Sequence, residues 1–120
     1  DSYHAICSTT LREFASQRLL TTVPCVSEAM HLLHREGGFS YPQQLWALLL
    51  SGELELVALD LDQLRAVYFF MEKYQDYPMA LADATLLVAS SALRVKVVFT
   101  LDKGFRVFRL FDGSVLDIIP

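Results

Sequence analysis

Residues 79–102, with the sequence MALADATLLVASSALRVKVVFTLD, decide the fold of this chain. The segment 79–93 is apolar almost throughout and predicts an apolar helix. The segment 95–100, VKVVFT, is a β-branched run that is typical of a buried strand in a parallel sheet. Strands that are separated by such helices indicate an α/β domain with a mostly parallel sheet flanked by helices.

The rest of the chain continues this alternation of helices and strands. We expect helices over residues 1–18, 26–35, 42–50 and 61–74, and strands over residues 19–24, 53–60 and 115–119. Proline ends the first of these strands, and Gly37-Gly38 and Gly52 end two of the helices. Asp60 marks the beginning of the helix that follows it. There is no internal repeat or linker, so we expect one domain over residues 1–120.

Size and charge narrow the class of protein. A chain of 120 residues that is 53% hydrophobic and 20% charged can build one compact core. Its net charge of -4 shows no excess of basic residues of the kind that nucleic-acid-binding proteins usually have, although an acidic metal site would itself add negative charge.

Cys7 and Cys25 lack zinc-ligand spacing, and we expect two reduced thiols in a cytoplasmic protein. No charge-free stretch reaches the roughly 20 apolar residues of a membrane span.

Three acidic residues lie in strongly apolar settings: Glu28, Asp83 and Asp102. A carboxylate among residues that favour burial costs free energy unless a cation or hydrogen bonds compensate it. Each of the three lies where an apolar run meets the start of a helix. In parallel sheets, ligands bind beyond the carboxyl ends of the strands. The three carboxylates therefore predict a shared site for Mg²⁺ or Mn²⁺, which take oxygen ligands, and hence a metal-dependent hydrolase, most plausibly a nuclease.

Each carboxylate also has a simpler explanation. Glu28 could lie in the first turn of its helix, where the macrodipole favours an acid. Asp102 could only cap a short helix, and Asp83 could lie at a partly exposed edge of its helix. The coincidence of all three favours a site over these separate explanations.

The other polar and aromatic side chains give weaker signals. No histidine has metal or catalytic-triad spacing, so His31 and His34 are expected on a helix surface or in the core. Three aromatic residues in one helix are expected in the core and at a subunit contact: Tyr68, Phe69 and Phe70. Three basic residues after Asp102 could meet a phosphate backbone or lie in a solvated loop: Lys103, Arg106 and Arg109.

Three segments together resemble a known family. TTVPCVSEAMHLL (21–33), YPMALADATLLVAS (77–90) and VVFTLDKGFRVFR (97–109) resemble, in order and spacing, the second to fourth motifs of PIN domains, in particular the VapC-type toxin ribonucleases. The resemblance implies a PIN-like three-layer α/β domain and an endoribonuclease that uses Mg²⁺ or Mn²⁺. It implies that Glu28, Asp83 and Asp102 are the catalytic metal ligands and that Thr100 hydrogen-bonds within the site. It also implies a homodimer and an antitoxin protein that occupies the active-site groove.

The resemblance has one departure at its beginning. The family opens with a strand that carries a first acidic residue, whereas the segment 1–14, DSYHAICSTTLREF, resembles the helix that follows that strand. We therefore expect the domain to be truncated at its N-terminus and to lack one metal ligand. Two other functions stay open: a catalytically inactive PIN-like protein-interaction module, and another Mg²⁺-dependent phosphohydrolase.

Overall fold

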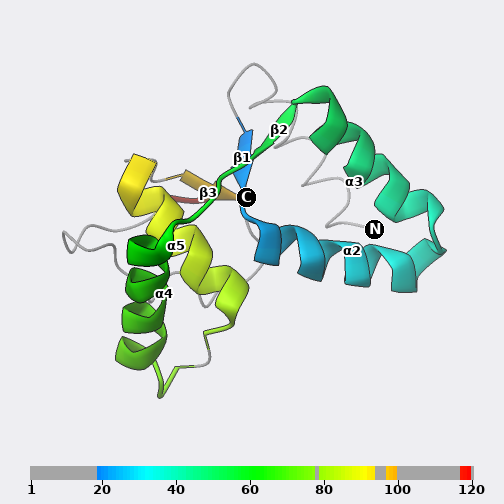
Figure 1. Ribbon diagram of the computed structural model, residues 1–120. Helices are drawn as coiled ribbons and strands as arrows, with labels where there is room; N and C mark the ends of the chain where they lie inside the picture. The colour runs from blue at the N-terminus through cyan, green and yellow to red at the C-terminus, as the bar shows by residue number, and fades with distance from the viewer. Residues whose placement is uncertain (1–18, 78, 94–96, 100–116, 120) are drawn as a thin grey trace. The chain divides into compact units, whose positions relative to one another are not determined.

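The computed structural model of the chain describes residues 19–77, 79–93, 97–99 and 117–119 (Figure 1). The chain divides into two compact units, one of residues 19–89 and one of residues 1–18 and 90–120. Several sequence predictions lie outside the described residues. These are the helix over 1–18 and the roles of Cys7, Thr100, Asp102, Lys103, Arg106 and Arg109.

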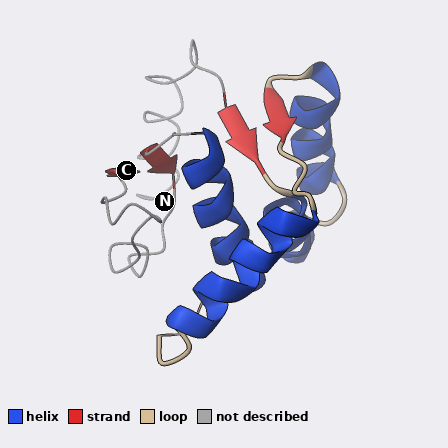
Figure 2. Ribbon diagram, turned by 60° about the vertical axis from the view of Figure 1, so that its left-hand side comes forward, coloured by secondary structure: helices blue, strands red, loops and turns tan. Residues whose placement is uncertain are grey.

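The unit of residues 19–89 contains a pair of parallel strands, β1 (Leu19–Thr21) and β2 (Leu54–Leu56). Leu19 pairs with Leu54 and Thr21 pairs with Leu56. The backbone N–H of Val57 extends the pairing by donating to the carbonyl of Thr21 at 2.8 Å. Parallel strands require a crossover connection, and here it consists of two helices, α2 (Val23–Gly37) and α3 (Ser40–Ser51) (Figure 2).

Helix α2 begins earlier than the sequence predicts. Thr22 is its N-cap residue in an extended conformation, so that Pro24 lies in the first helical turn instead of ending the strand. Proline is tolerated there because the N–H that it lacks would have no partner within the helix. The strand before it is correspondingly shorter than the predicted range 19–24.

Glycines end both crossover helices, as the sequence predicts. Gly38 follows α2 with φ 68° and ψ -158°, and its N–H donates to the carbonyl of His34 at 2.9 Å. Gly52 follows α3 in the left-handed conformation, and its N–H donates to the carbonyl of Leu49 at 3.3 Å. The two helices pack against each other, and α3 also contacts β2.

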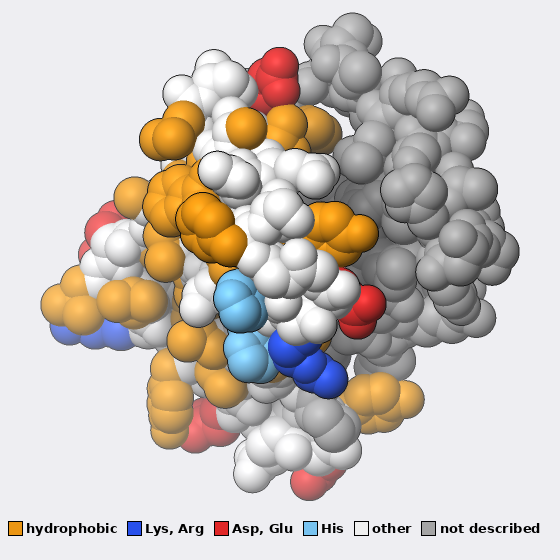
Figure 3. Space-filling view, turned by 90° about the vertical axis from the view of Figure 1, so that its right-hand side faces the viewer, with side chains coloured by type: hydrophobic (Ala, Val, Ile, Leu, Met, Phe, Trp, Pro, Cys, Tyr) orange, Lys and Arg blue, Asp and Glu red, His pale blue; other side chains and the backbone are white. Residues whose placement is uncertain are grey.

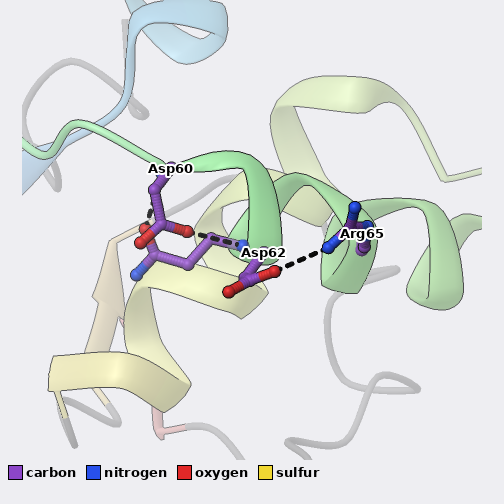
Figure 4. Close-up of polar contacts among 4 residues, drawn as sticks. Asp60, Asp62 and Arg65 are labelled. Atoms are coloured by element: carbon purple, nitrogen blue, oxygen red, sulfur yellow. Dashed lines mark hydrogen bonds and ion pairs between the residues drawn. The ribbon is translucent and has the colours of Figure 1, made fainter.

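Helix α4 (Leu61–Lys73) begins where the sequence predicts it, directly after Asp60, which is its N-cap residue. The Asp60 side chain accepts from the backbone N–H of Gln63, and the Gln63 side chain accepts from the backbone N–H of Asp60, both at 2.8 Å (Figure 4). This capping box satisfies two donors that have no partner within the helix. Of the predicted strand range 53–60, only Leu54–Leu56 forms a strand. Asp60, at the end of that range, is the cap of α4.

Helix α5 (Leu81–Leu93) supplies most of the buried apolar side chains of the described structure. The buried apolar residues are Val67 and Phe70 from α4 and Ala82, Ala84, Leu87, Val88 and Ala89 from α5. The predicted apolar helix over 79–93 is therefore confirmed, apart from its first two residues. None of the helices in the described part of the chain is long and apolar enough to cross a membrane.

The other unit contains a second pair of parallel strands, β3 (Val97–Phe99) and β4 (Asp117–Ile119). Val97 pairs with Asp117 and Phe99 pairs with Ile119. Both strands fall inside the predicted ranges 95–100 and 115–119. Because both described strand pairs are parallel and helices separate β1 from β2 and β2 from β3 along the chain, the α/β class with parallel strands is confirmed.

Substitution of Gly38 and Gly52, the glycines that follow α2 and α3, tests how these helices end. At both positions an added Cβ would meet open space, so any loss of stability comes from the backbone alone. We expect Gly38→Ala to lower the free energy of unfolding by about 1–3 kcal/mol, because its φ and ψ are essentially restricted to glycine. Gly52→Ala should cost about 1 kcal/mol, because other residues reach the left-handed helical region. Urea denaturation measures both, and a larger loss for Gly52→Ala would contradict this account.

Candidate metal-dependent active site

Glu28 lies in the second turn of α2, and its side chain is exposed. The first turn of α2 contains no acidic residue, because the helix begins at Val23. The explanation that Glu28 only offsets the helix macrodipole in the first turn is therefore wrong. Its carboxylate is accessible to an ion or substrate that approaches from solvent.

Asp83 lies in the first turn of α5 and is half-buried. Its carboxylate accepts a hydrogen bond from the backbone N–H of Ala80 at 3.1 Å. This contact stabilises the start of α5, and a negative charge at a helix N-terminus is also favoured by the macrodipole. Asp83 thus has a structural contribution of its own, and that contribution also fixes the direction of one carboxylate oxygen.

A cluster of buried polar groups joins the start of α2 to the start of α5. The hydroxyl oxygens of Thr22 and Thr85 lie 2.7 Å apart, although 63 residues separate them in the chain. Thr85 donates to the carbonyl of Ala82 at 2.7 Å, and Cys25 donates to the same carbonyl at 3.5 Å. Because each hydroxyl has one proton, the Thr22 proton is shared between Thr85 and the Cys25 sulfur at 3.1 Å.

This cluster brings together the two segments that carry the predicted ligands. Glu28 follows Cys25 by three residues, which places the two side chains about 60° apart around α2. Asp83 directly follows Ala82, whose carbonyl is the acceptor at the centre of the cluster. Asp102 lies outside the described residues. Within the described part of the chain, no group of three or more His, Cys, Asp or Glu side chains is placed to hold a metal ion.

Sequence reasoning missed the two threonines of this cluster. Thr22 occupies an N-cap position, yet its side chain makes no capping hydrogen bond and is used for the contact with Thr85. Thr85 is a polar residue in an apolar helix, two residues after Asp83. A polar side chain in such a helix is a signal in the sequence for a buried hydrogen bond. Both residues are only 1% exposed, so each hydroxyl needs a partner inside the protein.

The remaining predicted side chains fall mostly on the surface. His31 and His34 are exposed on α2, which confirms the surface alternative for both. Phe70 is buried, whereas Tyr68 and Phe69 are exposed on α4. The Tyr68 hydroxyl donates to the Glu72 carboxylate at 3.0 Å, and this hydrogen bond is the main reason that the pKa of Tyr68 is raised. Cys25 is a half-buried free thiol, as the sequence predicts.

Replacing the two threonines by valine, which has the same shape, tests the link between α2 and α5. We expect Thr22→Val and Thr85→Val each to lower the free energy of unfolding by about 1–2 kcal/mol, because each leaves a buried polar group with one partner fewer. The double variant should lose about 1 kcal/mol less than the two single losses together, because both substitutions remove the same contact. Ser40→Ala, at an exposed hydroxyl, is the control. Additive losses in urea denaturation would contradict the coupling.

The donor atoms of the candidate ligands indicate which kind of metal ion they suit. Carboxylate oxygens at the start of α5 and on an exposed face of α2 suit a hard divalent cation better than zinc, which favours nitrogen and sulfur ligands. Within the described residues, the thiol of Cys25 is engaged by the Thr22 hydroxyl and the Ala82 carbonyl. Comparison of the chain with protein-family models and with curated proteins found no match.

Proposed function

We propose that this protein is a PIN-like, divalent-metal-dependent endoribonuclease and acts as the toxin of a VapBC-type pair, inhibited by an antitoxin protein. The observation that carries the proposal is the buried junction of Thr22, Cys25, Ala82 and Thr85. It holds the segment of Glu28, just after β1, against the segment of Asp83. Asp102 follows β3 in the chain by three residues. Glu28 and Asp102 thus each follow a parallel strand in the chain, and ligands of parallel sheets bind beyond the carboxyl ends of the strands.

The donor set determines which ion the site would take. Glu28, Asp83 and Asp102 offer carboxylate oxygens, which Mg²⁺ and Mn²⁺ prefer as protein ligands. Such an ion, when bound, acidifies a water molecule and offsets negative charge on the phosphodiester. The protein would hold the ion through these three carboxylates, and the exposed Glu28 is accessible to accept the proton of the attacking water.

Cleavage of RNA tests this proposal directly. We expect Mg²⁺- or Mn²⁺-dependent cleavage of a single-stranded RNA, abolished by EDTA and reduced by about 100-fold or more in Glu28→Gln, Asp83→Asn and Asp102→Asn. Calorimetric titration with Mn²⁺ should show weaker binding in the same three variants. Glu36→Gln removes an exposed carboxylate from the same helix and should change neither result.

The expected additional ligand determines which protein is assayed. Because the resemblance implies one further acidic ligand, the assay compares the chain as given with a form that is extended at its N-terminus. Absence of cleavage by both folded forms would contradict the ribonuclease. Mn²⁺-independent binding of a protein partner would then favour the interaction module, and hydrolysis of a phosphate monoester would favour another phosphohydrolase.

The surface of α3 supports a protein partner, and we propose a second copy of the chain. Helix α3 contains no charged residue, and it exposes Trp46 to 47% and Leu50 to 80%. Apolar patches of this kind mark interaction sites. Because the chain has a net charge of -4, two copies meet with least repulsion at a neutral surface, and the same patch can serve both copies of a symmetric dimer.

A charge placed on α3 tests the dimer. We expect the unmodified protein to be a dimer by light scattering coupled to size-exclusion chromatography, and Leu50→Glu to shift it to a monomer. Stability should change little, because Leu50 is already exposed. Leu64→Glu places the same charge on an exposed position of α4 and should leave the dimer intact. An unmodified protein that is monomeric at all concentrations would overturn the proposal.

A further inference from the structure

One exposed face of α2 carries an acidic end and a basic end. Glu28, His31 and Arg35 are all exposed, and their spacing of three and seven residues places them within about 60° of arc on the helix. Helix α3 packs against α2 elsewhere and leaves these side chains accessible. Figure 3 shows the two histidine side chains next to each other, with a basic side chain beside them.

The basic end of this face is available for an external anion. Among the described cations, Arg65 pairs with Asp62 at 2.7 Å, and Lys73 lies 5.4 Å from the centre of the Tyr74 ring. Arg35 has no ion pair within the described part of the chain. The adjacent acid Glu36 lies about 100° away from Arg35 around the helix. A neutral histidine still has one N–H donor, so His31 can bind a phosphate oxygen without being protonated.

The two ends of this face lie about two helical turns apart. A helix rises 1.5 Å per residue, so Arg35 lies about 10.5 Å beyond Glu28 along the axis, with His31 between them. A cation at one end and a predicted metal ligand at the other fit a strand that runs from a phosphate anchor to the cleavage site.

We propose that this face of α2 is the track on which single-stranded RNA reaches the site. The proposal rests on the ribonuclease function, with the phosphate to be cut at Glu28. His31 and Arg35 bind the phosphates of the nucleotides on one side of it, and neither takes part in the chemistry. Arg35 supplies one cation and His31 one N–H donor on this face, so the track offers local phosphate contacts on a chain whose net charge is -4.

Binding of RNA in EDTA tests the track without any cleavage. The affinity of a fluorescein-labelled single-stranded oligoribonucleotide is measured by anisotropy over a range of salt concentrations. We expect Arg35→Ala to weaken binding about ten-fold and to reduce the salt slope by about 0.7, the value for one phosphate contact on a single strand. Arg35→Lys should keep the salt slope, and His31→Ala should weaken binding less. Arg65→Ala, which removes an exposed arginine from α4, is the matched control.

The acidic end of the track gives a second and opposite readout. In EDTA, the Glu28 carboxylate repels the phosphate beside it, so Glu28→Gln should tighten RNA binding about three-fold. Glu36→Gln makes the same change away from the track and should have less effect. Circular dichroism confirms that each variant is folded.

Three outcomes would overturn the track. These are equal effects of Arg35→Ala and Arg65→Ala, unchanged binding in Glu28→Gln, and Arg35-dependent binding of an acidic peptide without binding of RNA.

The ribonuclease proposal is judged separately by cleavage in Mg²⁺ or Mn²⁺. Arg35-dependent RNA binding without cleavage supports the track and contradicts the nuclease. Cleavage that is insensitive to Arg35→Ala supports the nuclease and contradicts the track.

Discussion

The contact between the hydroxyls of Thr22 and Thr85 is the interaction on which the described structure most depends. Both side chains are buried, and a buried hydroxyl without a partner costs about 1–3 kcal/mol. Each threonine therefore constrains where the other can lie, and with Cys25 and the Ala82 carbonyl they fix the start of α2 against the start of α5. Glu28 and Asp83 receive their positions from this junction, so that structural hydrogen bonds determine where the candidate ligands lie.

For the binding of partners, the distribution of charge over the surface matters more than the net charge of the chain. A net charge of -4 argues against a nucleic-acid-binding protein, yet the described surface separates its charged and neutral regions. The exposed face of α2 carries Glu28 at one end and Arg35 at the other, whereas α3 carries no charge at all. Electrostatic recognition acts over about one Debye length, roughly 8–10 Å at physiological salt, so each of these regions can act independently of the total charge.

The elements that the sequence predicted best are those whose ends are fixed by local chemistry. The capping box of Asp60 and Gln63 and the glycines at positions 38 and 52 involve neighbours within four residues, so their signals are complete in the sequence. Pro24 was misread as the end of a strand, because proline is equally compatible with a strand end and with the first helical turn. The length of β2 was overestimated, because an alternating pattern shows which side chains could face a core but not how far a partner strand extends.

The sequence by itself determined the helix-strand order, the parallel character of the strands and the identity of the candidate ligands. A carboxylate in an apolar run stands out from the amino-acid pattern alone, because its burial would be costly. Only the tertiary structure decided that Thr22 contacts Thr85 and that Cys25 contacts the Ala82 carbonyl. It also decided that the face of α2 that carries Glu28, His31 and Arg35 is exposed. These facts depend on which faces of α2 and α5 are covered, and pairs that are 57 and 63 residues apart leave no periodic trace in the sequence.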